Sequence, residues 1–122
     1  MNDFLKSSNE DHMMYKLCIL MMLSDRFPHP KELVKLCNII DSKDWMESIK
    51  NEDILDSIDQ VSREIYEYKG VRATARIYAH LLKGKDAQKT TLAYCEEIMN
   101  ADGEIKIEEL RVLDELTAIW NS

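Results

Sequence analysis

The chain has 122 residues, of which 45% are hydrophobic and 32% charged, and its formal net charge at pH 7 is −7. This length fits one domain with a sizeable core. The negative charge argues against generic nucleic-acid binding, which depends on lysine and arginine displacing counterions from phosphates.

Hydrophobic periodicity predicts helices along the chain and no strand. Residues 1–8 are predicted to form a flexible tail, and Asn9 or Asp11 is predicted to cap the first helix, which ends near Ser24. Lys16 is the one strongly polar position within the apolar run of this helix. We therefore expect the first helix to be central, with other helices around it.

The later helices are placed by their caps and stops. They are predicted at 30–41, at 44–49 as a short helix, from a cap at Asn51 to a stop at Gly70, at 71–83, from a cap at Asp86 to about 100, and at 107–120. Ile77, Leu81 and Leu110 are expected to face the core. Residues 9–122 thus predict an all-α fold, a single-domain bundle of about six to seven helices with an internal pseudo-repeat of helix-turn-helix units.

Two acidic turns repeat within the chain. Asp25 and Glu32 recur as Asp102 and Glu109 at a constant offset of 77 positions. Carboxylates so placed can converge on a hard cation such as calcium or magnesium, so Asp102 and Glu109 are the predicted metal ligands, with Glu104, Asp25 and Glu32 as further candidates. The alternative interpretation is that these residues only complete helix ends, where acidic side chains favour the helix dipole.

The segment at 99–105, followed by Glu108, Glu109 and Leu110, resembles the signature of the TerB-like family. That family includes tellurite-resistance proteins and the soluble domain of the DjlA type of membrane co-chaperone. The resemblance extends more weakly through residues 17–36. It implies an all-helical, pseudo-duplicated domain whose acidic turn residues bind metal, and which acts in stress response or as a module of larger complexes rather than as an enzyme.

A basic stripe forms a second candidate site. Its residues recur at helical spacing: Lys69, Arg72, Arg76, His80 and Lys83. Lys69, Arg72 and Arg76, together with Trp120 near the C-terminus, are the predicted interaction residues, since basic patches and partly exposed aromatic side chains occur in protein interfaces. The alternative is that the stripe is solvated or paired within the chain.

Cys18, Cys37 and Cys95 are odd in number and have no C-x-x-C spacing, which predicts reduced thiols that serve as small core residues. The chain starts without the pattern of a secretory signal, and its longest apolar run is shorter than the roughly 20 residues that span a bilayer. We therefore expect a cytoplasmic protein without membrane insertion.

The leading hypothesis is a non-enzymatic TerB-like accessory module that binds a divalent cation weakly at the acidic turn and associates with a protein partner. The alternative is an interaction domain without metal, docking through the basic stripe or Trp120. A metal-dependent hydrolase is the least favoured hypothesis, because no general base or electrophile with recognisable spacing accompanies the carboxylates. A homo-oligomer is left open.

Overall fold

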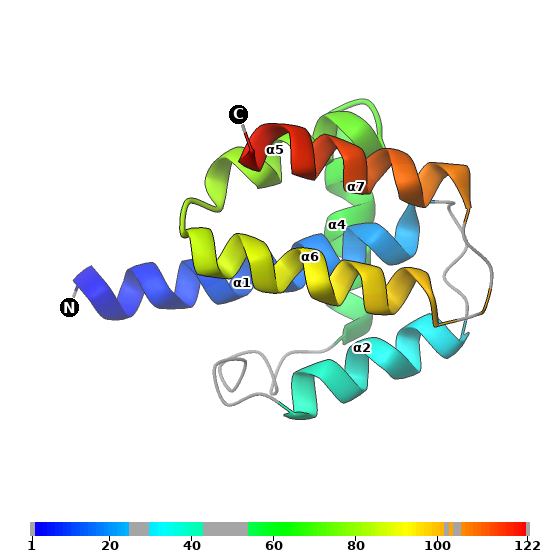
Figure 1. Cartoon of the computed structure of the whole chain (residues 1–122), viewed down its shortest axis with the longest axis horizontal. Helices are drawn as coiled ribbons and strands as arrows, with labels where there is room; N and C mark the ends of the chain where they lie inside the picture. Colours follow the sequence, from blue (N-terminus) through cyan, green and yellow to red (C-terminus); the bar gives the residue numbers. More distant parts are fainter. Residues whose placement is uncertain (1, 25–29, 43–53, 102, 104–105, 122) are drawn as a thin grey trace.

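The structure, a computed structural model, describes residues 2–24, 30–42, 54–101, 103 and 106–121. These residues form helices packed as a bundle (Figure 1), and none of them lies in a strand, which confirms the all-α prediction for this part of the chain. The helices are α1 (Asn2–Leu23), α2 (Pro30–Ser42), α4 (Ile54–Glu67), α5 (Val71–Leu81), α6 (Lys85–Met99) and α7 (Ile107–Trp120).

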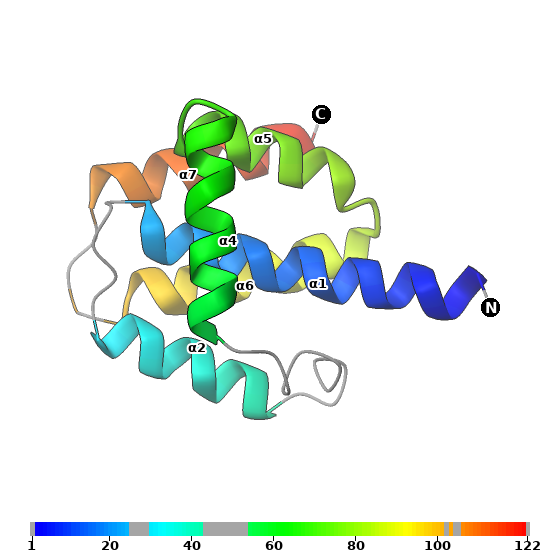
Figure 2. The same ribbon diagram turned by 180° about the vertical axis from the view of Figure 1, so that it is seen from behind.

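Helix α1 is the central helix, as predicted. Figure 1 shows α6 in front of it, and Figure 2, the reverse view, shows α4 crossing it on the other side. The side chains of residues 17–22 are completely buried. An amphipathic helix would leave one face of this segment exposed, so the all-round apolar pattern is explained by neighbours on every side.

Lys16, the one strongly polar residue in the apolar run of α1, forms an ion pair with a carboxylate of α4. Lys16 Nζ lies 2.5 Å from Glu64 Oε1, and the Tyr78 hydroxyl on α5 donates a 2.5 Å hydrogen bond to the same oxygen. Lys16 Nζ also lies 4.8 Å from the centre of the Tyr78 ring, within cation–π range. Burial, followed by the bond to Glu64, raises the pKa of Tyr78 far above its ordinary value. This triad joins three helices through one carboxylate.

The predicted repeat corresponds to two helical hairpins, α1 with α2 and α6 with α7. Helices α1 and α6 run alongside each other in the same direction, while α2 and α7 return on opposite sides of that pair (Figures 1 and 2). Two pairs of residues that lie 77 positions apart are buried to a similar degree. Cys18 and Cys95 are fully buried, and Glu32 and Glu109 are almost fully buried in the first turns of α2 and α7. The sequence repeat is therefore a repeat of structure.

The start of α1 differs from the prediction. The helix begins at Asn2, so the predicted cap at Asn9 or Asp11 is wrong. No glycine or proline precedes Asp11, and the helix therefore continues through these residues without an unfavourable backbone position. Figure 1 shows the first turns of α1 extending beyond the other helices.

The start of α6 also differs. Gly84, and not Asp86, is the N-cap, and Asp86 lies in the first turn, where its charge favours the positive end of the helix dipole. A Cβ atom at position 84 would lie 2.8 Å from Glu10 Oε2 on α1. Glycine at this position thus leaves room for the Glu10 carboxylate beside the start of α6.

The predicted stop at Gly70 is present, and Lys69 takes the left-handed backbone conformation at this helix end. The Gly70 N–H donates to the Ile65 carbonyl at 2.8 Å and the Lys69 N–H donates to the Tyr66 carbonyl at 3.2 Å, the two bonds of a Schellman motif. The left-handed position of this motif is held by Lys69, with φ 66°, and Gly70 follows with φ 135°. The left-handed residue of this helix end thus precedes Gly70 by one position.

Three residues that are predicted to face the core are exposed. Leu110 on α7 is 42% exposed, whereas Glu109 and Val112 are buried. Ile77 and Leu81 on α5 are also exposed. The buried face of α5 instead consists of smaller residues and one tyrosine, namely Thr74, Ala75, Tyr78 and Ala79. The small side chains let α5 pack closely on α1. The predicted helix at 44–49 and the cap at Asn51 fall in a part of the chain that the structure does not describe.

Candidate functional site

Two of the five predicted metal ligands, Glu32 and Glu109, are among the residues that the structure describes. Asp25, Asp102 and Glu104 lie outside the described residues, while Glu32 and Glu109 are 2% and 1% exposed. The C-terminal ends of α1 and α6 and the N-terminal ends of α2 and α7, which flank the two turns, lie at the same end of the bundle in both views (Figures 1 and 2). The fold therefore brings the flanks of the two turns to one end of the molecule.

Glu109 has a structural role that accounts for part of its burial. Its Oε1 accepts a hydrogen bond from the backbone N–H of Lys106, the N-cap of α7, at 3.2 Å. This is the return bond of a capping box, in which the third residue of a helix satisfies the amide that precedes the helix. The helix-end interpretation thus holds for one oxygen of this carboxylate.

Among the described residues, no group of three or more histidine, cysteine, aspartate or glutamate side chains is placed to hold a metal ion. Three of the five predicted ligands, Asp25, Asp102 and Glu104, are not among the residues described. The prediction of a cation site therefore stays a prediction.

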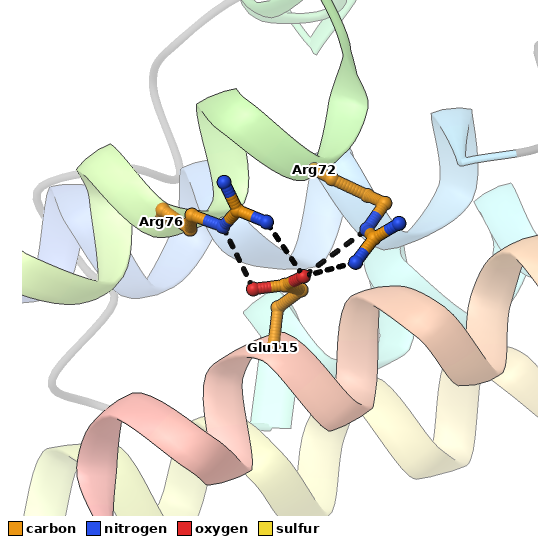
Figure 3. A network of polar contacts seen from close by, with 3 residues as sticks. All are labelled: Arg72, Arg76 and Glu115. Atoms are coloured by element: carbon orange, nitrogen blue, oxygen red, sulfur yellow. Dashed lines mark hydrogen bonds and ion pairs between the residues drawn. The ribbon is translucent and has the colours of Figure 1, made fainter.

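The basic stripe is paired within the chain at two of its positions. Arg72 donates to Glu115 Oε1 on α7 through Nη2 at 2.6 Å and Nε at 3.1 Å. Arg76 donates through Nε to Oε2 at 2.9 Å and through Nη2 to Oε1 at 3.0 Å. Figure 3 shows both guanidinium groups on α5 meeting this single carboxylate. One glutamate thus fastens α7 to α5 and balances only one of two positive charges.

The two guanidinium groups hold the pKa of Glu115 at about 2, chiefly through the hydrogen bonds from Arg76 and Arg72. A carboxyl whose pKa is lowered on folding stabilises the folded state above its unfolded pKa, here 4.5, and this stabilisation is lost as the pH falls toward 2. We expect the urea midpoint of the wild-type chain to fall across this pH range, and that of Glu115→Gln to fall less. The readout is circular dichroism at a series of pH values.

Salt provides the control for this prediction. Both arginine side chains are more than half exposed, so added salt should screen the interaction and bring the two pH profiles together. Parallel profiles for wild type and Glu115→Gln at low salt would contradict the assignment.

Trp120 holds the end of α7 against the bundle. Its indole Nε1 donates a 2.9 Å hydrogen bond to the Ala79 carbonyl on α5, and its ring packs against the core. The structure thus gives Trp120 a contact inside the chain, while its predicted contact with a partner stays a prediction.

An open groove lies beside Lys69, the first residue of the basic stripe. Its volume is about 830 Å³, and its walls are mostly apolar. Leu23, Ile65 and Val71 contribute apolar wall, Ser62 and Glu67 contribute polar edges, and Tyr66, Lys69 and Gly70 complete the lining. We call this cavity the α4–α5 groove.

Tyr66 lines the α4–α5 groove with 88% of its surface accessible. Lys69, Gly70 and Val71 also line a neighbouring cavity of about 590 Å³, together with Arg72 and Glu108. The groove is therefore continuous with the basic stripe. The sequence pattern did not predict this site. The one signal in the sequence is Tyr66, an aromatic residue on the charged face of α4.

Comparison of the chain with protein-family models, with curated proteins and with solved structures finds no match. Within the described ranges, no helix has the length and apolar character needed to cross a membrane.

Proposed function

We propose that this chain is a non-enzymatic helical module that binds another protein at the α4–α5 groove. The observation that carries the proposal is Tyr66, a large aromatic side chain left almost fully exposed beside a mostly apolar cavity. Tyrosine and arginine are among the residues that most often dominate binding energy in interfaces; Tyr66 lines this groove and Arg72 lines the neighbouring cavity. The resemblance to TerB-like accessory modules favours the same class of function.

The charges beside the groove favour an acidic partner. Arg72 and Arg76 each use Nε and Nη2 for Glu115, so the Nη1 of each takes no part in this pairing and can donate to an acceptor from outside the chain. Lys69 adds a third positive charge on the groove itself. We therefore propose that the occupant is an acidic segment of another protein, with an apolar side chain in the groove and carboxylates facing the basic stripe.

Site-specific photo-crosslinking in cells tests this proposal. A photoreactive phenylalanine derivative is placed at Tyr66 or, as the matched control, at Leu55, which is exposed on the same helix but does not line the groove. We expect a protein crosslinked from position 66 and not from position 55. Tyr66→Ala and Lys69→Glu should then each weaken binding of that protein at least about tenfold, measured by titration with the purified partner.

Equal crosslinking from positions 66 and 55 would contradict the docking site. A partner that binds through an uncharged or basic segment would contradict the proposed charge complementarity while leaving the groove as the site.

Weak binding of a divalent cation is the second part of the proposal. It is supported by the equivalent buried positions of Glu32 and Glu109 and by the shared location of the helix ends that flank the turns. Glu109→Gln keeps an oxygen that can accept from the Lys106 N–H but removes the charge. In calorimetric titration with calcium or magnesium, we expect weak binding by wild type and loss of that heat in Glu109→Gln, with nearly unchanged stability. No heat from wild type, or equal heat from both, would rule out the site.

A further inference from the structure

Two cysteine side chains meet in the core of the molecule. Cys18 on α1 and Cys95 on α6 are fully buried free thiols, and their side chains are hydrogen-bonded to each other. They are separated by the same 77 positions that relate the two hairpins. Helices α1 and α6 also make the most extensive helix–helix contact in the described part of the chain. Equivalent residues thus face each other across the boundary between the repeats.

The environment of the Cys18 thiol slows its reaction with oxidants. The hydrogen bond to Cys95 and burial raise the pKa of the Cys18 thiol well above its ordinary value. Since the thiolate is the reactive form, this thiol reacts slowly until a local opening admits an oxidant. Cys37 on α2 is only partly buried and provides an internal comparison.

We propose that Cys18 and Cys95 are a redox modification site, and that they form an intrachain disulfide when the folded chain meets hydrogen peroxide. One cysteine sulfur attacks a peroxide oxygen, the O–O bond breaks, and a sulfenic acid and one water are formed. The second sulfur attacks the sulfenic sulfur, the S–S bond forms, and a second water leaves. The two thiols lose two electrons and two protons, and one peroxide molecule is reduced to two waters.

This bond would join the two hairpins covalently at their shared interface. Because it closes a long loop, it restricts the unfolded chain strongly, and the urea midpoint of the oxidised protein should rise by about 1 M or more. Dithiothreitol should reverse the rise. A surface modification of Cys37 would have neither effect.

The experiment treats the folded chain with hydrogen peroxide, blocks the remaining thiols with an alkylating agent, and analyses unreduced peptides by mass spectrometry. We expect the peptides containing Cys18 and Cys95 to be linked, with the loss of two hydrogen atoms, together with the higher urea midpoint. Cys37→Ser, the matched control, should keep both results, and Cys95→Ala should lose both.

Linkage through Cys37 in place of this pair would overturn the proposal. So would oxidation of Cys18 or Cys95 to sulfinic acid without a link, or survival of both thiols under peroxide and under the thiol oxidant diamide.

Discussion

Glu64→Leu is expected to lower the free energy of unfolding by about 3 kcal/mol, because it leaves a charge in the interior without its partner. Lys16 would keep its largely buried ammonium group beside an apolar side chain, and the Tyr78 hydroxyl would lose its acceptor. Urea unfolding followed by circular dichroism measures the loss, and the slope of the transition shows whether the folded state stays compact.

The control for this prediction removes the whole polar triad. In the variant Lys16→Met/Glu64→Leu/Tyr78→Phe no buried charge or hydroxyl remains unpaired, and we expect a stability within about 1 kcal/mol of wild type. An equal loss in the single and the triple variant would contradict the role given to the unpaired charge.

Trp120→Ala is expected to cost about 3 kcal/mol, the lower end of the range for removing a large aromatic side chain, since the tryptophan is only partly buried. The loss combines the ring's contact with the core and the hydrogen bond to the Ala79 carbonyl. Trp120→Phe keeps most of the ring contact and should cost about 1 kcal/mol for the lost hydrogen bond. Thermal and urea unfolding measure both variants.

Leu81→Ala provides the matched comparison for Trp120, because Leu81 is a large apolar residue of the neighbouring helix that lies exposed. Its substitution should change stability by less than about 0.5 kcal/mol. A loss for Trp120→Ala as small as this would show that Trp120 does not secure the helix end, and would favour its predicted role in contact with a partner.

The helices and the centre of the fold could be predicted from sequence because both follow from local apolar patterns. The run around Lys16 is apolar on every side, and a helix of that kind must be covered on every side. The repeat could be predicted as well, since a constant offset relates Asp25 and Glu32 to Asp102 and Glu109. These signals need no knowledge of which helices touch.

The exposure of Leu110 and the burial of Glu109 at the start of α7 could not be predicted from side-chain polarity. Leu110 was assigned to the core by its apolar character, yet it is exposed, and its neighbour Glu109 is buried because its carboxylate accepts the Lys106 amide. A hydrogen bond that satisfies a polar group removes most of the cost of burying it. Hydrophobicity alone therefore selects the wrong residue at this helix start.

The pairing of the basic stripe depends on contacts that are distant in sequence. Arg72 and Arg76 meet Glu115 about 40 positions later, and helical spacing gives no sign of that partner. For these two arginines the structure shows pairing within the chain, which is the alternative interpretation of the basic stripe. The α4–α5 groove likewise exists only once α1, α4 and α5 have packed, so neither Tyr66 nor Lys69 could be assigned to it from sequence.

The parallel pairing of α1 with α6 has a consequence for synthesis of the chain. The first helix leaves the ribosome long before its main partner, because residues 24–84 separate the two. A nascent chain that has made only the first hairpin therefore carries an apolar helix with most of its surface uncovered. Such exposed surface is prone to aggregation and is what chaperones bind, so this chain should depend on protection until α6 has been translated.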